Sequence, residues 1–238
     1  MPRLKVITFD LDNTLWDVDR VIVNAERKMR AWLADHVPEY DALFPAEKLM
    51  DLRNQVLKTN PELRHDLSKL REELLYQAIQ RCGYGAAESR NHAAGAFALF
   101  FEARHEVEFF DGALEILAVL QERYMLGALT NGNADFVKLK LDEYFSFGFS
   151  SASVGAAKPA PEMFHAALQH AAAKPSESVH IGDHLVDDME GAANVGMHTV
   201  WVNLNDSDHP EHALRPSETV SKLQDIDHAI ERIDSANR

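Results

Sequence analysis

Two aspartates separated by one residue follow the first buried strand that the sequence predicts. Asp10 and Asp12 come directly after the apolar run Leu4–Phe9, and Asn13 and Thr14 come next. Unpaired charge at the end of a buried strand is costly, and carboxylates that lie close together repel each other unless a cation lies between them. The pattern therefore indicates a cation site at the end of this strand.

Three further polar clusters follow predicted strands or lie in a loop before a predicted helix. In open α/β sheets the ligand crevice lies at the carboxyl ends of the strands, so these clusters are candidates for one shared site. A single acid after a strand is more often a helix cap. A shared site is therefore indicated by the combination of the four clusters in this order. They are Asp10–Thr14, Thr130–Asn133, Lys158–Pro159 and Gly182–His184, with Asp187 and Asp188 after the last.

The residue types in these clusters favour metal-assisted phosphoryl chemistry. Oxygen ligands without cysteine and without an obligatory histidine suit a hard ion, above all Mg²⁺. One lysine, a threonine hydroxyl and turn amides can neutralise and hydrogen-bond a phosphoryl group. An aspartate carboxylate can itself attack phosphorus and form an aspartyl phosphate. We therefore expect Mg²⁺ as the cofactor and a small phosphorylated metabolite as the partner.

The sequence predicts two kinds of structure around these clusters. From about residue 17 to residue 105, apolar residues recur at helical spacing and there is almost no strand signal. Further along, strand-like runs alternate with helical runs, which predicts a parallel sheet with helices on both faces. The expected strands lie within 4–9, 124–132, 147–155, 178–183 and 198–203, and the expected later helices within 113–123, 135–145, 161–173, 186–196 and 223–233.

The predicted fold class is α/β, a Rossmann-like parallel-sheet core with an inserted all-helical domain. The core is assigned to 1–16 and 106–238, because the strand before Asp10 belongs with the later strands. The helical insert is assigned to 17–105.

Composition and charge exclude several classes of protein. The chain has 238 residues, a net charge of −14 and a pI near 5.2, and no basic run, so nucleic acid is not an expected partner. The single cysteine, Cys82, excludes an internal disulfide. No window reaches the roughly 18 apolar residues of a membrane helix, and the N-terminal stretch lacks the pattern of a signal peptide. We expect no membrane contact and a cytoplasmic protein, either a monomer or a homodimer.

Four short segments resemble the signature motifs of the haloacid dehalogenase (HAD) superfamily of phosphohydrolases: DLDNT, TNG, KP and GDHLVDD. The helical insert resembles the α-helical cap of that superfamily. Three longer segments, LTNGNAD, NPELRHDLSKLREE and VHIGDHLVDDMEGAANVGMHTVWVN, are similar to a bacterial branch of phosphatases. That branch acts on flavin mononucleotide (FMN) and on 5-amino-6-(5-phosphoribitylamino)uracil, an intermediate of riboflavin synthesis. The resemblance implies an Mg²⁺-dependent phosphatase in riboflavin metabolism.

The resemblance also implies catalytic roles for three residues. Asp10 is the expected nucleophile. Asp12 is the expected general acid, then the base that activates water, and it offers its backbone carbonyl to the metal. Lys158 is expected to pair with Asp10 and with the phosphoryl group. Such acid–base help is typically worth about 10²–10⁴-fold in rate.

Other positions are implied as ligands of the phosphate or the metal. Thr130 and the backbone amide of Asn131 are expected to hold phosphate oxygens. The expected metal ligands are Asp10, Asp12, Asp183 and Asp188. Asp187 is a near competitor of Asp188 for the second acid of the last motif, and one of the two is expected to orient Lys158 or a metal-bound water.

Several other functions are alternatives to the hydrolysis of an FMN-like phosphomonoester. A phosphatase for sugar phosphates or nucleoside monophosphates is the leading alternative. A dehalogenase needs neither a proton donor at the position of Asp12 nor Mg²⁺, and a hexose-phosphate mutase commonly has Gly-Val where this chain has Asn13 and Thr14. A non-catalytic phosphometabolite-binding module would be expected to lack Asp10, Asp12 or Lys158, and all three are present.

Some nearby residues have a simpler structural interpretation. Thr14 is expected to bond turn amides, Asn13 to form a turn, and His184 to lie in a surface loop. Trp16 and Trp32 are expected to pack in the cap rather than stack on a flavin. Solvated helix faces are the simple interpretation of Arg53, Arg64 and His65, with contact to the substrate as the alternative.

Overall fold

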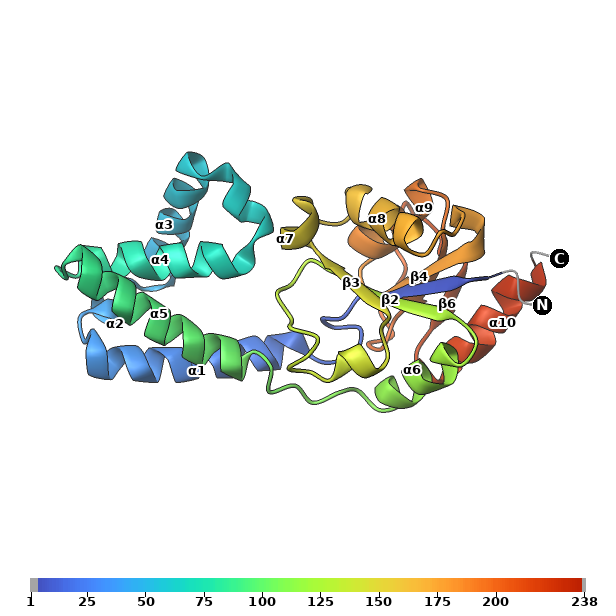
Figure 1. Cartoon of the computed structure of the whole chain (residues 1–238), viewed down its shortest axis with the longest axis horizontal. Coiled ribbons are helices and arrows are strands. Elements are labelled where there is room, and N and C mark those ends of the chain that lie inside the picture. The colour runs from blue at the N-terminus through green and yellow to red at the C-terminus, as the bar shows by residue number, and fades with distance from the viewer. Residues whose placement is uncertain (1–3, 237–238) are drawn as a thin grey trace. The chain divides into compact units, whose positions relative to one another are not determined.

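The computed structural model describes residues 4–236 and contains a six-stranded, all-parallel sheet (Figure 1). The strand order is β3-β2-β1-β4-β5-β6. This arrangement confirms the predicted α/β class with a parallel-sheet core and a helical insertion. The strands are β1 (Val6–Phe9), β2 (Met125–Thr130), β3 (Phe147–Ser150), β4 (Ser178–Gly182), β5 (His198–Val202) and β6 (Glu218–Val220).

Strand β1 lies in the middle of the sheet, between β2 and β4. All four of its residues are buried, as are the five residues of β4. A parallel strand that is covered on both faces has near-continuous apolar sequence, which is why VITF predicts a strand. In the observed register Thr8 lies beside Gly127 on one side and His180 on the other.

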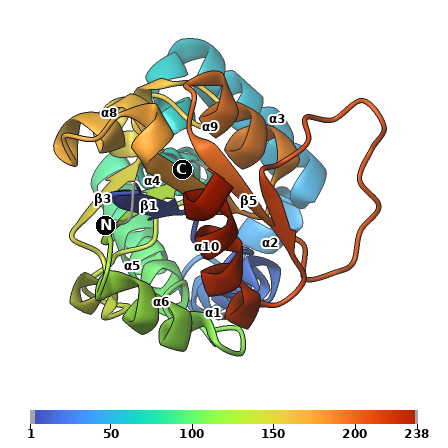
Figure 2. The same ribbon diagram turned by 90° about the vertical axis from the view of Figure 1, so that its right-hand side faces the viewer.

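Helices cover both faces of the sheet. Figures 1 and 2 show α6 (Ala113–Gln121) and α10 (Ile226–Ala236) on one face, and α8 (Glu162–His170) and α9 (Gly191–Asn194) on the other. Met163 and Phe164 of α8 are both fully buried. Shorter elements complete this part: α7 (Ser151–Val154), η2 (Leu141–Glu143), η3 (Pro175–Glu177), η5 (Leu223–Asp225) and the π-helical η4 (Leu185–Glu190).

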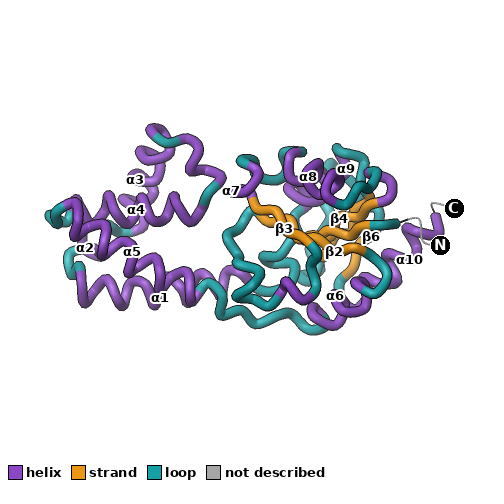
Figure 3. The backbone as a smooth tube through the Cα atoms, viewed as in Figure 1, coloured by secondary structure: helices purple, strands orange, loops and turns teal. Residues whose placement is uncertain are grey.

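The segment between β1 and β2 is helical, and Figure 3 shows strands only outside it. Within it α5 packs against α1 and α4 around an apolar core. The side chain of Asp66 begins α4 by accepting a hydrogen bond from the Lys69 backbone N–H at 3.0 Å. The helices are α1 (Val18–His36), α2 (Tyr40–Leu43), α3 (Ala46–Thr59), η1 (Pro61–His65), α4 (Leu67–Arg81) and α5 (Ala86–Ala103).

The chain divides into two compact units. Unit 1 comprises residues 1–17 and 108–238, and unit 2 comprises residues 18–107. The predicted core, 1–16 with 106–238, and the predicted cap, 17–105, differ from these bounds by one or two residues. The division into core and cap domains is kept as a proposal, and the outermost predicted core residues, 1–3 and 237–238, lie outside the described part. Over residues 4–236 no helix is long and apolar enough to cross a membrane.

One local prediction was wrong, and one strand was not predicted. The expected helix over 135–145 is a series of turns followed by η2. The Asp135 carboxylate accepts hydrogen bonds from the backbone of Val137 and Lys138, and Lys140 has a left-handed φ of 56°, both of which oppose a continuous helix. The edge strand β6, in the polar stretch after residue 206, was not predicted at all.

Candidate active site

All seven predicted site residues line one cavity of about 180 Å³ at the carboxyl ends of β1, β2 and β4. The cavity lies in unit 1. Asp10 follows β1, Thr130 ends β2 and Asp183 follows β4, so the parallel arrangement brings the three strand ends together. The lining residues are Asp10, Asp12, Asn13, Thr130, Asn131, Gly132, Lys158, Asp183, His184, Asp187 and Asp188.

The ammonium group of Lys158 is buried and has an acceptor for each of its three hydrogens. Nζ lies 2.6 Å from Asp10 Oδ1, 2.6 Å from Asp188 Oδ1 and 2.7 Å from the Leu129 carbonyl oxygen. Burial alone would lower the pKa of Lys158, but the charges of Asp10 and Asp188 outweigh burial and hold the pKa above its ordinary value. Lys158 is therefore a fixed positive charge in the site.

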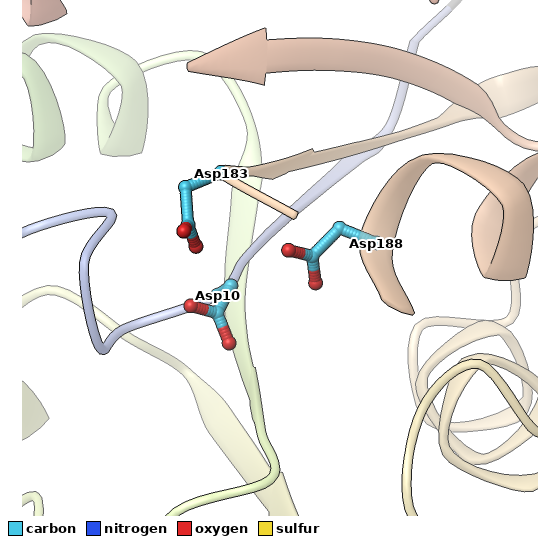
Figure 4. Close-up of side chains that lie close together, drawn as sticks. All are labelled: Asp10, Asp183 and Asp188. Carbon is cyan, nitrogen blue, oxygen red and sulfur yellow. The ribbon is translucent and has the colours of Figure 1, made fainter. Parts of the chain in front are cut away.

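Three carboxylates form the acidic side of the cavity. Oxygens of Asp10, Asp183 and Asp188 lie within 4.8 Å of one another, and Figure 4 shows the three side chains directed toward a common space. The Thr14 hydroxyl lies 3.2 Å from Asp10 Oδ2 and 3.2 Å from Asp183 Oδ1. Thr14 thus supports the carboxylates themselves, and the prediction that it bonds turn amides was wrong.

The three carboxylates have different proton affinities. Burial raises the pKa of Asp10 well above its ordinary value, and the charge of Lys158 only partly opposes this. Burial and the neighbouring Asp188 raise the pKa of Asp183 to about 6. Burial would also raise the pKa of Asp188, but Lys158 and the hydrogen bond from His180 outweigh it and hold this pKa well below its usual range. A divalent cation between the carboxylates would lower the raised values.

Asp12 lies at the same cavity but has a different partner. Its Oδ1 accepts a hydrogen bond from Trp16 Nε1 at 2.9 Å. Trp16 is fully buried and packs edge-to-face on Phe109, with ring centroids 5.6 Å apart. Trp16 therefore lies in unit 1 and anchors Asp12, so the prediction that it packs in the cap was wrong. Leu11, between the two acids, is fully buried.

The loop after β1 has the turn that was predicted at Asn13. Asn13 has a φ of 63°, and its backbone N–H donates to the Trp16 carbonyl at 2.8 Å. Asparagine tolerates this left-handed conformation better than most residues, which explains its place between the second acid and Thr14.

Asn131 holds the backbone of Lys158 with its side chain. Its Oδ1 accepts from the Lys158 backbone N–H at 2.8 Å, and its Nδ2 donates to the Lys158 carbonyl at 3.0 Å. Thr130 Oγ1 accepts from the Gly132 N–H at 2.9 Å, which leaves the hydroxyl hydrogen of Thr130 for donation. The predicted contacts of Thr130 and the Asn131 amide with phosphate stay predictions.

The two adjacent acids of the last cluster occupy different environments. Asp188 is buried in the ion pair with Lys158, whereas the Asp187 side chain is 37% exposed and lies 3.4 Å from Asn131 Nδ2. Of the two, Asp188 is the acid that contacts Lys158. His184, whose side chain is 59% exposed, accepts a hydrogen bond from the Asp187 backbone, in keeping with a surface position.

Sequence reasoning missed two buried polar residues beneath the site. His180 Nε2 lies 3.0 Å from Asp188 Oδ1, and His180 Nδ1 lies 2.8 Å from Thr8 Oγ1. Both residues are fully buried in adjacent strands. Burial lowers the pKa of His180, against the opposing effect of Asp188. The sequence feature that could have indicated these two residues is a polar residue in the middle of an apolar strand, which occurs in both strands.

Trp32, Arg53, Arg64 and His65 belong to unit 2. Trp32 stacks on His36 with ring centroids 3.8 Å apart, a packing contact within that unit. The Nε atom of Arg64 donates to the Pro61 carbonyl at 3.0 Å. Contacts of Arg53, Arg64 and His65 with a substrate stay predictions.

Comparison with known proteins identifies the family. The family model for haloacid dehalogenase-like hydrolases matches residues 4–196. The chain belongs to this family.

Its relatives within the family include phosphatases. It is 31% identical over 206 residues to the 5-amino-6-(5-phospho-D-ribitylamino)uracil phosphatase YigB of Escherichia coli, covering 87% of this chain and 86% of that protein. It is also 31% identical to a glyceraldehyde 3-phosphate phosphatase of Pyrococcus furiosus, covering 84% of this chain and 81% of the relative. The prediction of a HAD-type enzyme of the phosphatase class is confirmed at the level of the family.

A solved structure of another family member has nearly the same fold. It is the crystal structure of a 2-haloacid dehalogenase from Pseudomonas syringae, with a TM-score of 0.92 and 36% sequence identity, covering 96% of this chain and 99% of that chain. Proteins similar to this chain thus include phosphatases and a dehalogenase. The residues of the site must distinguish these two activities.

Proposed function

We propose that this HAD hydrolase is an Mg²⁺-dependent phosphatase that cleaves a small phosphomonoester through an aspartyl phosphate on Asp10. The single observation that carries the proposal is the buried ion-pair group, in which Lys158 Nζ lies 2.6 Å from both Asp10 and Asp188 beside the open cavity. The second acid, Asp12, lines the same cavity.

Asp10 is proposed as the nucleophile. One of its carboxylate oxygens attacks phosphorus, an O–P bond forms, and the bond from phosphorus to the ester oxygen breaks. Lys158 and Thr14 hold the carboxylate in one orientation, so little orientational freedom is lost when the substrate binds. The product of this first step is the phosphorylated Asp10 and the departing alcohol.

Asp12 is proposed to move the protons of both steps. As an acid it protonates the departing ester oxygen, and as a carboxylate it then accepts a proton from water while that water attacks the phosphoaspartate. The second attack releases inorganic phosphate and restores Asp10. The hydrogen bond from Trp16 holds the Asp12 carboxylate at the cavity, which supports this assignment.

Lys158, Thr130 and the amide of Asn131 are proposed to hold the phosphoryl oxygens. A fixed cation and oriented donors stabilise negative charge that grows at phosphorus in the transition state. Asn131 supports this function indirectly as well, since its side chain holds the Lys158 backbone on both sides.

The acidic cluster suits a hard divalent cation. Its donors are carboxylate oxygens of Asp10, Asp183 and Asp188 within 4.8 Å of one another, and Mg²⁺ prefers oxygen ligands of this kind. The backbone carbonyl of Asp12 is proposed as a further ligand. When bound, Mg²⁺ would neutralise the carboxylates and polarise the phosphoryl group.

Asp12 is the residue that favours a phosphatase over a dehalogenase. A carbon–halogen bond releases a halide ion that needs no proton, so a dehalogenase has no use for a proton donor two residues after the nucleophile. This chain has Asp12 with a dedicated anchor in Trp16, and it has the acidic cluster. The same features argue against a non-catalytic binding module.

The proposed substrate is 5-amino-6-(5-phosphoribitylamino)uracil or FMN, in riboflavin metabolism. Similarity to the E. coli enzyme supports this choice. A sugar phosphate or a nucleoside monophosphate is the second candidate, supported by the similarity to a glyceraldehyde 3-phosphate phosphatase and to a pyrimidine 5'-nucleotidase. The cytoplasmic location stays a prediction from the sequence.

The test is a panel of phosphate esters assayed for phosphate release with Mg²⁺ and with EDTA. The panel contains p-nitrophenyl phosphate, FMN, the ribitylaminouracil phosphate, sugar phosphates and nucleoside monophosphates, and 2-chloropropionate is assayed separately for chloride release. We expect Mg²⁺-dependent phosphate release with the highest kcat/KM on a ribityl phosphate. Chloride release without turnover of any phosphate ester would overturn the proposal.

A further inference from the structure

Beneath the acidic cluster, two polar side chains connect the centre of the sheet to Asp188. Thr8 of β1 and His180 of β4 lie side by side in the sheet register, and both are fully buried. His180 contacts Thr8 through Nδ1 at 2.8 Å and Asp188 through Nε2 at 3.0 Å. The imidazole ring therefore spans the distance between a strand hydroxyl and a carboxylate of the site.

The hydrogens of this chain can be assigned from its acceptors. The Asp188 carboxylate also receives Lys158 Nζ and the His184 backbone N–H, so it is an acceptor throughout. The atom of His180 that faces it, Nε2, must carry the hydrogen. Nδ1 then has a lone pair, which the Thr8 hydroxyl can meet at 2.8 Å; the other acceptor within reach of that hydroxyl, the Val179 carbonyl oxygen, is farther away at 3.3 Å.

These contacts fix the Asp188 carboxylate from several sides. Oδ1 accepts from both Lys158 and His180, while Oδ2 accepts from the His184 N–H at 3.0 Å. Gly182 leaves room for this arrangement, because a Cβ at that position would lie 2.4 Å from Asp188 Oδ2. The His180 ring is itself held by Phe164, with centroids 5.1 Å apart in an edge-to-face contact.

We propose that His180 is a positioning residue, which carries its hydrogen on Nε2, is met by the Thr8 hydroxyl at Nδ1, and holds Asp188 in the orientation needed to bind the metal and to orient Lys158. The proposal rests on the proposed function, since it assigns Asp188 to an Mg²⁺ site. Side chains that orient metal ligands in this way typically contribute 10–100-fold to metal affinity or activity.

Three substitutions of His180 separate orientation from simple packing. His180→Gln can place an amide N–H near the position of Nε2, His180→Asn can place one only near Nδ1, and His180→Leu offers neither. We expect Mg²⁺ to bind roughly 10–100-fold more weakly to the Asn and Leu variants, and less than about 5-fold more weakly to the Gln variant. Thr8→Val is expected to weaken Mg²⁺ binding about 3–10-fold. Thr8→Ser keeps the hydroxyl and is expected to bind Mg²⁺ with nearly the affinity of the wild type.

The first measurement is the dissociation constant of Mg²⁺, determined by calorimetric titration of the metal-free full-length protein without substrate. The second is the separation of kcat from KM with p-nitrophenyl phosphate at saturating Mg²⁺. We expect kcat to fall in the Asn and Leu variants more than KM changes, because a misdirected Lys158 stabilises the transition state less.

Thr199→Val is the matched control. Thr199 is a buried threonine of β5, the register neighbour of His180 on the opposite side from Thr8, and its hydroxyl accepts from the Ser217 backbone instead of reaching the site. We expect Thr199→Val to destabilise the fold to a similar extent as Thr8→Val, with an unchanged Mg²⁺ dissociation constant.

The outcomes separate the inference from the proposed function. Wild-type protein that neither binds Mg²⁺ nor hydrolyses any phosphate ester would overturn both. A second outcome would overturn the inference alone. In it the wild-type protein binds Mg²⁺ and hydrolyses a phosphate ester, but the His180 and Thr8 variants have the same Mg²⁺ dissociation constant as Thr199→Val. A loss in the Gln variant as large as that in the Leu variant would also overturn it, because the result would then follow side-chain shape and not the Nε2 hydrogen bond.

Discussion

The interiors of the two units differ in where they bury polar groups. In unit 1, buried polar side chains gather at one end of the central strands, with Thr8, Asp10, Thr130, Lys158 and Asp188 among them. In unit 2, Ser89 and Arg104 are the buried polar residues in the part of the chain that the structure describes, and the remaining core is apolar.

The charged side chains of unit 2 lie mostly at its surface. Arg71 pairs with Glu26, and Arg30 pairs with Asp41, all at partly exposed positions. Ion pairs of this kind contribute little to stability. In the described part of unit 2, Arg104 is the one buried charged residue and the rest of the core is apolar, whereas unit 1 groups several buried charges at one cavity, as a hydrolytic site requires. Each of the following predictions tests this difference between the two units.

The largest expected effect on activity comes from Asp10→Asn. Because an amide cannot attack phosphorus as a carboxylate does, kcat should fall at least about 10³-fold. The unfolding free energy of the metal-free protein should stay equal or rise, since the raised pKa of Asp10 shows that its charged form is disfavoured there. Phosphate release and urea unfolding measure the two quantities, and near-native turnover would remove Asp10 from the role of nucleophile.

Lys158→Met should damage both activity and stability. Removing the cation leaves Asp10 and Asp188 without their shared partner in a buried site, which should cost about 3–5 kcal/mol of unfolding free energy and at least about 10²-fold in kcat. Lys5→Met is the control, because Lys5 is exposed and pairs with Glu177 at the surface. Its expected cost is below about 1 kcal/mol, and equal costs for the two variants would contradict the contrast between buried and surface charge.

A pair of phenylalanine substitutions compares the two cores directly. Phe100 of unit 2 and Phe164 of unit 1 are both fully buried, so each change to alanine should cost about 3–5 kcal/mol. Only Phe164 contacts His180, and only Phe164→Ala should weaken Mg²⁺ binding, by roughly 10-fold. Thermal unfolding and Mg²⁺ titration of both variants provide the comparison. An equal loss of Mg²⁺ affinity in Phe100→Ala would show that the metal site depends on packing in either unit.

The smallest expected effect is a pH dependence from Asp183. Its pKa of about 6 in the folded protein lies above its ordinary value of 3.8, so the folded state binds this proton more tightly than the unfolded state. The resulting stabilisation is present below about pH 4 and is lost as the pH rises through 6. Between pH 4.5 and pH 7 the metal-free protein should lose roughly 2 kcal/mol of unfolding free energy from this group.

Asp183→Asn is the control for the pH experiment. Chemical unfolding in EDTA at several pH values should show a shallower decline in the variant than in the wild type. Saturating Mg²⁺ should remove much of the decline in the wild type, because the bound cation favours the ionised carboxylates. Identical pH profiles of the two metal-free proteins would contradict the assigned pKa.

The features that could be predicted from the sequence are those with a local pattern. The strand before Asp10 is a short apolar run, and Asp10, Thr130 and Asp183 all follow such runs, so the rule for parallel sheets groups them. The segment 135–145 was mispredicted because Val137, Leu141 and Phe145 recur four positions apart, which fits a helix. In the structure, a series of turns and η2 bury Leu141 and Phe145 instead.

The remaining features depend on contacts between distant residues. His180 and Thr8 are 172 positions apart, and only the strand register brings them together. A single histidine in an apolar strand gives no indication of its partner. The same holds for Asn131, whose hold on the Lys158 backbone across 27 positions depends on how two loops meet.

The place of unit 2 in the chain affects how the protein is made on the ribosome. Strand β1 is synthesised first, but its neighbours begin at residues 125 and 178. The whole of 18–107 therefore emerges before either neighbour exists, and this contiguous helical segment has its own apolar core, in which α5 packs against α1 and α4. The strand that precedes the proposed nucleophile is the first strand of the sheet to be made, and both of its edges can be covered only after β4 has been synthesised as far as Gly182.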